Sequence, residues 1–154
     1  MKNTVAVNES KRADKAAFDF ENYKISKFSF IEVPKDNLNT ITLGFLPSGR
    51  FFKNSRKFII DLVFTAQLDD EKGNPGEEIM NVSLEAFFNF SEDVTFDTIP
   101  VYFYRNALAI IFPYLRSFVS TLTFQANIKP VILPVMNLTA LEEPFKQQTF
   151  LIEE

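Results

Sequence analysis

The residue types that most enzyme and metal sites require are missing from this chain of 154 residues. It contains no His and no Cys, which excludes a Ser-His-Asp triad, a thiol nucleophile and a zinc site with nitrogen and sulfur ligands. Acid–base catalysis would have to use carboxylates, Lys or Tyr, which is a much narrower choice. The composition therefore predicts a protein that is not an enzyme and that carries no metal or other cofactor.

Two segments have the spacing of ligand-binding loops but lack the ligands. The run from Gly44 to Gly49 has the glycine spacing of a phosphate-binding loop, but Arg50 and Phe51 stand where Lys and Ser or Thr are needed. The acidic run 69–78 lacks the alternating ligand positions of an EF-hand calcium loop, so we expect a solvated hairpin turn. Neither segment predicts a nucleotide or metal site.

Basic and aromatic residues are interleaved in the segment that follows. The basic residues are Arg50, Lys53, Arg56 and Lys57, and the aromatic ones are Phe51, Phe52 and Phe58. This combination can bind single-stranded nucleic acid, but the cluster is short and the net charge of the chain is −4. Such a charge gives no general attraction to nucleic acid or to anionic membranes, and we expect neither partner.

The elements that would carry a binding surface can be predicted from the periodicity of apolar residues. Residues 1–17 are polar and of mixed charge, which predicts a flexible N-terminal arm before a domain over 18–154. The predicted strands cover residues 23–33, 58–68 and 79–90. Pro34 should end the first strand, 35–55 should form a long connection, and the turn residues of 69–76 should join the last two strands into an antiparallel meander.

The spacing of apolar residues then changes to steps of three and four, which predicts a helix. Its apolar stripe consists of Leu108, Ile111, Leu115, Phe118 and Leu122. Pro113 is expected to kink this helix, because it removes a hydrogen bond to the Ala109 carbonyl. Asn137 or Thr139 can cap a last short helix, where Thr139 and Glu142 have capping-box spacing. Strands followed by helices predict an α+β fold with the helices on one face of an antiparallel sheet.

The sequence predicts that this protein is itself neither exported nor inserted into a membrane. The residues after Met1 include no apolar segment of the signal-peptide type, and apolar runs such as Ala107 to Tyr114 are too short to span a bilayer. We therefore expect a cytoplasmic protein. Its 19 Phe residues supply large apolar surfaces without a polar group, so those that are not core residues can bind apolar partners.

Two motifs resemble the signature half of the SecB family of export chaperones. Phe112-Pro113-Tyr114-Leu115-Arg116 is similar to the family's F-P-Y-A-R helix. Pro134-Val135-Met136-Asn137-Leu138-Thr139-Ala140-Leu141 is similar to its P-V-N-F-x-A-L entry into the last helix, at nearly the same distance. Upstream, Glu32-Val33-Pro34 resembles the end of the family's first strand, and residues 41–45 fall at its alternating apolar crossover segment. The resemblance covers residues 23–148 approximately and keeps the order of the elements.

The resemblance implies a SecB-like fold, a four-stranded antiparallel sheet with two helices packed on one face, assembled as a homotetramer that is a dimer of dimers. It implies an ATP-independent holdase that binds unfolded preproteins in apolar grooves for export. Burying one client Phe or Leu gains about 1.5–3 kcal/mol, whereas ordering each client residue costs about 1–2 kcal/mol. Several anchors must therefore act together. The client-binding residues that we expect are Ile41, Leu43, Phe45, Met80, Val82, Leu84, Leu141 and Phe145.

The surface that meets the SecA ATPase is acidic in that family and is only partly present here. Glu32 is the expected contact, whereas Phe28 and Asn81 stand where the family has acidic residues. This predicts weak or absent binding to SecA. Two alternatives remain open, a SecB-like chaperone of a toxin–antitoxin system and a carboxylate enzyme or small-ligand binder on a similar scaffold. An open apolar groove would favour a chaperone, and a closed pocket with converging polar residues would favour the enzyme or ligand binder.

Overall fold

The computed structural model describes residues 16–33 and 37–154. Residues 1–15 of the expected arm and Pro34, the expected end of the first strand, lie outside these ranges. The strands are β1 (Phe18–Phe30), β2 (Ile41–Phe52), β3 (Lys57–Asp69), β4 (Pro75–Phe90) and β5 (Thr149–Ile152). The helices are α1 (Phe103–Gln125) and α2 (Thr139–Gln147), and a short 3-10 helix, η1 (Phe96–Thr98), precedes α1.

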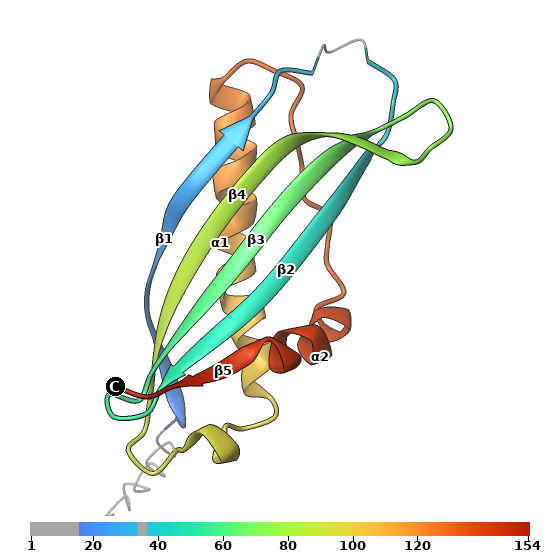
Figure 1. The fold of residues 1–154 in the computed structure, drawn as a ribbon. Helices are drawn as coiled ribbons and strands as arrows, with labels where there is room; N and C mark the ends of the chain where they lie inside the picture. The colour runs from blue at the N-terminus through green and yellow to red at the C-terminus, as the bar shows by residue number, and fades with distance from the viewer. Residues whose placement is uncertain (1–15, 34–36) are drawn as a thin grey trace, which may run out of the picture.

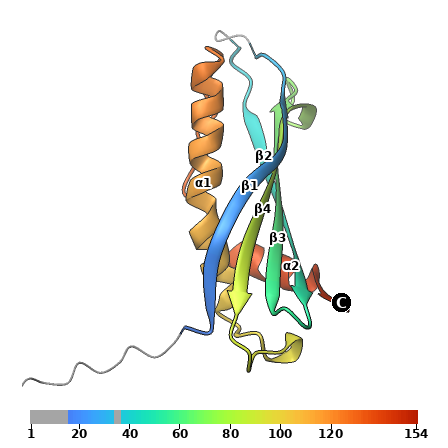
Figure 2. The ribbon, with the colours of Figure 1, turned by 90° about the vertical axis from the view of Figure 1, so that its left-hand side faces the viewer.

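The strands form one sheet in the order β1-β4-β3-β2-β5 (Figure 1). β2, β3 and β4 are antiparallel neighbours in a meander, β1 adds antiparallel to β4, and β5 adds parallel to β2. Figure 2 shows α1 in a separate layer along one face of the sheet. The predicted α+β class with a meander and helices on one face is confirmed, with four main strands and a short fifth.

The predicted long connection over 35–55 is wrong for most of its length, because β2 pairs with β3 in step from Ile41 to Phe51. Gly44, Pro47 and Gly49 made this segment resemble a loop. Pro47 is tolerated because β2 is paired along only part of its outer edge, and an edge is where a sheet accepts Pro. β5 was not expected, since a four-residue strand after a helix has no periodicity long enough to recognise.

The core lies between the sheet and the inner side of α1. The buried side chains of α1 are those of Phe103, Tyr104, Ala107, Leu108, Ile111, Phe112, Leu115, Val119 and Thr123. Phe103 is the centre of an aromatic cluster, with its ring centroid 4.8 Å from Phe18, 4.7 Å from Phe58 and 4.8 Å from Phe90. The contacts with Phe18 and Phe58 are edge-to-face, a geometry that stabilises a core beyond the area that it buries.

Helix α1 is longer than the sequence predicted and continues through Pro113 without a break. Pro113 and Ala109 both lie on its exposed side, away from the core. By length and composition α1 would also suffice to cross a membrane, but core helices meet the same criterion, and here its inner side packs on the sheet. In α2 the capping prediction is wrong, because Leu138 is the N-cap residue and no side chain caps it.

Candidate functional site

Successive residues of β2 direct their backbone N–H and C=O groups alternately toward β3 and toward the outer edge of the strand. Even-numbered residues face β3, where the N–H of Asp69 donates to the Thr40 carbonyl (2.9 Å). Odd-numbered residues face the outer edge, where the N–H of Gly49 donates to the carbonyl of Gln148, just before β5 (2.9 Å). The pairing of β2 with β3 stays in step, so the same alternation applies along the whole strand from Ile41.

The side chains of Ile41, Leu43 and Phe45 lie in a row along this outer edge. All three are half-buried and pack against the core, because side chains two residues apart share one face of a strand. The Phe45 ring contacts Phe64 on β3 and Phe112 on α1, at centroid distances of 5.3 and 5.8 Å. The structure therefore brings these three predicted client-binding residues together, and we call them the edge row.

One carboxylate fixes the beginning of β2. The hydroxyl of Thr40 donates to Asp69 Oδ2 (2.6 Å) and that of Thr42 donates to Oδ1 (2.7 Å). These two hydrogen bonds stabilise the charged form and lower the pKa of Asp69, although partial burial opposes the shift. The edge row thus begins at a point that is held to β3 by side chains as well as by the backbone.

An unfilled hydrogen-bond donor lies on the α1 side of the edge row. The guanidinium carbon of Arg116 is 5.6 Å from the centre of the Phe112 ring, which is the ring that Phe45 contacts. The Arg116 Nε is buried, and no described residue accepts its hydrogen bond. Buried donors normally have an acceptor, which this nitrogen lacks among the described residues.

Four other predicted client-binding residues belong to the core instead. Met80, Val82 and Leu84 are buried on the helix-facing side of β4, between β1 and β3. Phe145 on α2 is also fully buried, with its ring edge-on to Tyr104 at 5.1 Å. In the protomer these four side chains offer no surface to a client, because β4 is a central strand and α2 turns its apolar side inward.

The remaining predicted residues lie nearer the surface. Leu141 on α2 is half-buried and packs against the core, and Glu32 is exposed. Phe28 does not lie on the helix-free face of the sheet, because its ring packs edge-on against Phe118 of α1 at 5.4 Å. Asn81 does lie on that face, where its amide donates to Glu78 (2.7 Å). Only one of the two positions where the family is acidic therefore faces away from the helices.

Exposed apolar side chains that the sequence analysis missed surround the connection 126–138 between the helices. They are Leu38, Phe124, Ile132 and Val135, with 94%, 75%, 74% and 90% of their surface exposed. Phe124 and Ile132 line a shallow, largely apolar hollow of about 470 Å³ at the end of α1. The sequence signal was available, because Ile132 and Val135 are apolar residues beside two prolines, in a loop that is expected to be polar.

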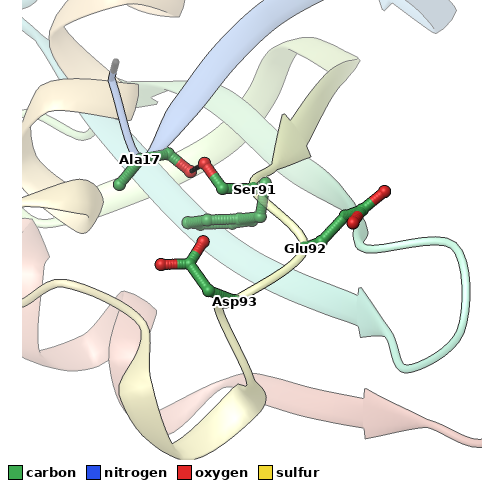
Figure 3. Close-up of a pocket in the computed structure, with 5 residues that line it drawn as sticks. Ala17, Ser91, Glu92 and Asp93 are labelled. Atoms are coloured by element: carbon green, nitrogen blue, oxygen red, sulfur yellow. Dashed lines mark hydrogen bonds between the residues drawn. The ribbon is translucent and has the colours of Figure 1, made fainter. Parts of the chain in front are cut away.

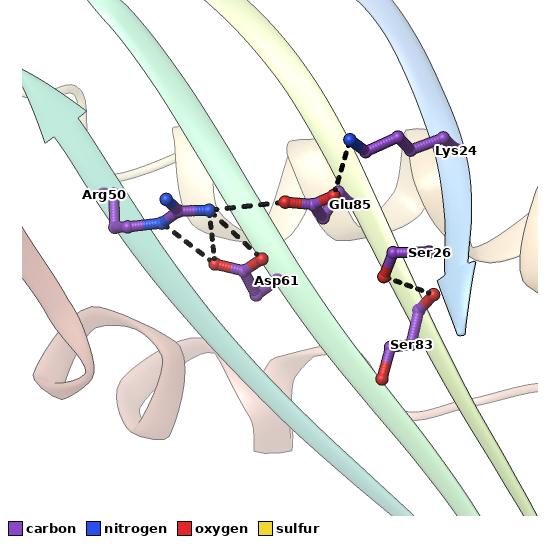
Figure 4. Close-up of polar contacts among 6 residues, drawn as sticks. All are labelled: Lys24, Ser26, Arg50, Asp61, Ser83 and Glu85. Atoms are coloured by element: carbon purple, nitrogen blue, oxygen red, sulfur yellow. Dashed lines mark hydrogen bonds and ion pairs between the residues drawn. The ribbon is translucent and has the colours of Figure 1, made fainter. Parts of the chain in front are cut away.

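The helix-free face of the sheet carries a charged ladder across its four main strands (Figure 4). Lys24 on β1 pairs with Glu85 on β4 (3.0 Å), and Arg50 on β2 pairs with Asp61 on β3 (3.1 Å) and Glu85 (3.5 Å). Asp61 and Glu85 are direct cross-strand neighbours, and like charges in that position repel. Arg50 offsets this repulsion, so both carboxylates already have cationic partners.

A second hollow, of about 550 Å³, lies at the other end of the sheet (Figure 3). Its wall is the turn after β4, where the Ser91 hydroxyl donates to the Ala17 carbonyl (3.2 Å). Glu92 and Asp93 form its rim and are exposed. Two exposed carboxylates make this hollow a poor site for an apolar segment.

The two loops considered for ligands have structural roles. A methyl group at Gly49 would lie 2.7 Å from Phe58 Cε1, and one at Gly44 would lie 2.6 Å from the Thr65 hydroxyl, so both glycines permit close packing. In the predicted hairpin turn, Asp70 Oδ1 accepts the N–H groups of Lys72 and Asn74, both at 2.9 Å. In the described ranges no three residues converge as a metal site would require.

Two known proteins are similar to this chain, one in sequence and one in structure. No family model matches it. It is 35% identical over 133 residues to the uncharacterized protein MJ0357 of Methanocaldococcus jannaschii, which covers 82% of this chain and 83% of the relative. Its structure is similar to that of the Mycobacterium tuberculosis Rv1957 SecB-like chaperone in complex with a ChAD peptide from the Rv1956 HigA1 antitoxin. The TM-score is 0.60 at 14% identity, over 79% of this chain and 91% of the other. The chain therefore has the fold of SecB-like chaperones and belongs to the same family as MJ0357.

Proposed function

We propose that this protein is a cytoplasmic, ATP-independent holdase that binds unfolded polypeptide segments. The observation that carries the proposal is the edge row of Ile41, Leu43 and Phe45, an apolar line at an open sheet edge and not a closed polar pocket. Leu141 and the exposed apolar residues around the connection 126–138 would extend this surface. The similarity to a SecB-like chaperone that is bound to a peptide supports the same reading.

A holdase of this kind needs several copies of the site. Each half-buried side chain of the edge row has only part of its area left to offer, so one client anchor gains less than the 1.5–3 kcal/mol or so of full burial. We therefore propose a homo-oligomer, a dimer of dimers, in which several sites act on one client. The outer side of α1 supports this, because its exposed residues Ala109, Pro113, Ser117 and Thr121 carry no charge.

The charged ladder and the comparison both support one class of client. Export through SecA would use an acidic sheet surface, but Asp61 and Glu85 are already paired with Arg50 and Lys24. The similar chaperone binds a peptide from an antitoxin. We therefore place a short segment of an unstable partner, such as an antitoxin, before a preprotein as the client. A carboxylate enzyme has less support, because both carboxylates of the ladder, Asp61 and Glu85, already have cationic partners.

The proposal is tested by suppression of aggregation of a chemically unfolded protein in the absence of nucleotide. The unmodified protein should suppress aggregation, and Leu43→Ser should weaken this by removing an edge-row side chain. Leu46→Ser is the matched control, because Leu46 lies on the same strand but on the helix-free face and is 68% exposed. Failure of the unmodified protein to suppress aggregation, or equal effects of both substitutions, would contradict the proposal.

A further inference from the structure

The outer edge of β2 is paired along only part of its length. β5 covers it from Gly49 to Phe52, and no described residue forms a backbone hydrogen bond to the edge between Ile41 and Leu46. The odd-numbered residues Ile41, Leu43 and Phe45 direct their N–H and C=O groups outward there. Pro47 separates the two parts, and its missing N–H would have faced outward, so the bonds to β3 are unaffected.

This open part of the edge lacks the protection that sheet edges normally have. Exposed edge strands are usually guarded by charged side chains, yet β2 has no charged residue from Ile41 to Gly49. The opposite edge strand, β1, carries Asp19, Glu21, Lys24 and Lys27. These charges lie between Asp19 and Lys27 of β1, whereas the open part of β2 carries none and remains able to accept a strand.

We propose that the β2 edge from Ile41 to Leu46 binds an extended client segment by strand addition, an inference that rests on the proposed function. The occupant is an unfolded polypeptide stretch of about six residues with apolar side chains at alternate positions. β5 already occupies the continuation of this edge as a strand, so the edge is geometrically competent. Backbone bonds are independent of sequence, while the edge row selects apolar side chains on the helix-facing side.

Strand addition requires free backbone amides at alternate positions of the client. Binding through side-chain contacts alone does not require them. The probe is a labelled nonapeptide in which Leu and Phe alternate with Ser and Lys. Two variants carry N-methyl groups on either the apolar or the polar residues. In an antiparallel addition the amides of the apolar residues face β2, and in a parallel addition those of the polar residues do.

We expect one methylated peptide to bind at least about tenfold more weakly, because it loses several hydrogen bonds at once, and the other to bind like the unmodified peptide. The identity of the weakly binding peptide shows whether the added strand runs antiparallel or parallel to β2. Equal binding of both variants, whether strong or weak, would overturn strand addition while leaving side-chain binding intact. No binding of the unmodified peptide would overturn the proposed function as well.

Variants of the protein provide an independent measurement. Leu43→Pro and Leu43→Ala both lose the side chain, but only the proline variant also loses the outward N–H. Pro47 shows that this edge accepts a proline at an outward position. Leu43→Pro should bind the unmodified peptide several-fold more weakly than Leu43→Ala at a similar melting temperature. Equal affinities would overturn the inference, as would a lower oligomer mass of Leu43→Pro, since the edge would then be a subunit interface. If Leu43→Pro does not fold, the two methylated peptides decide.

Discussion

Replacing Gly49 with Ala tests how closely β2, β3 and β5 are packed at the covered end of the edge. A methyl group at this position would lie 2.7 Å from Phe58 Cε1 and 2.9 Å from the Thr149 hydroxyl. Phe58 cannot easily move, because it is fully buried and its ring contacts those of Phe103 and Phe145 at 4.7 and 6.1 Å. The substitution therefore forces either the ring or β5 to shift.

The expected cost follows from two opposing contributions. Overpacking of a well-filled core costs about 1–3 kcal/mol, while Ala in a strand is favoured over Gly by roughly 0.5–1 kcal/mol through backbone entropy. We expect a net loss of about 1–2 kcal/mol in the free energy of unfolding. Gly44→Ala should cost less, because its neighbour is the Thr65 side chain on the helix-free face, which can rotate. Gly73→Ala meets no atom but has a φ of 81°, which costs about 1–2 kcal/mol in backbone strain.

The measurement is urea unfolding of the three variants at one protein concentration, because assembly contributes to apparent stability. A double variant, Gly49→Ala with Phe58→Leu, identifies the contact. Removing ring atoms should reduce the cost of Gly49→Ala, and coupling energies of about 0.5–3 kcal/mol are usual for residues in contact. The argument is refuted if Gly49→Ala is as stable as the unmodified protein, or if its cost is the same beside Leu at position 58.

Three further predictions concern assembly, pH and partners. Light scattering at micromolar concentration should give an oligomer mass that Ser117→Glu on the outer side of α1 lowers; a monomer mass for the unmodified protein would contradict the proposed assembly. Because the pKa of Asp69 is lowered in the folded state, its stabilising effect is present at neutral pH and is lost as the pH falls below about 4. Unfolding measured between pH 2 and 6 should show this loss in the unmodified protein and less of it in Asp69→Asn; identical pH profiles would refute it. Calorimetry should show weak or no binding to SecA, strengthened by Asn81→Glu, and tight, salt-sensitive binding by the unmodified protein would contradict the prediction.

The sequence predicted those elements whose periodicity is set by burial. β3 and β4 alternate because one of their faces lies in the core and the other does not, and the apolar stripe of α1 is the side that packs on the sheet. The turn between β3 and β4 was recognised because its residues satisfy its own backbone, as Asp70 does. These signals are local, so a single chain reveals them.

Features that depend on contacts between distant segments were not predictable in the same way. Whether Met80 or Leu43 is accessible depends on the position of its strand within the sheet, which alternation does not reveal. Gly44, Gly49 and Pro47 made β2 resemble a loop, because each is explained only by the folded sheet. Gly44 lies against the Thr65 side chain and Gly49 against the Phe58 ring. The missing N–H of Pro47 would have faced the outer edge. The three residues of the edge row share one face, as their alternation indicated, but they belong to a strand and not to a loop, and their role in client binding stays a prediction.

The strand order also constrains how the protein emerges from the ribosome. β1 is made first, but its partner is β4, so Phe18 waits for Phe90 and Phe30 waits for Met80. At synthesis rates of about 5–20 residues per second, β1 stays without its partner for several seconds. The local hairpins β2–β3 and β3–β4 can close first, because short loops cost less entropy than long ones. β5 completes the sheet last, since it joins Gly49 only after residue 149 has been made. During that interval a nascent chain of this protein exposes apolar strands of the kind that its mature edge is proposed to bind.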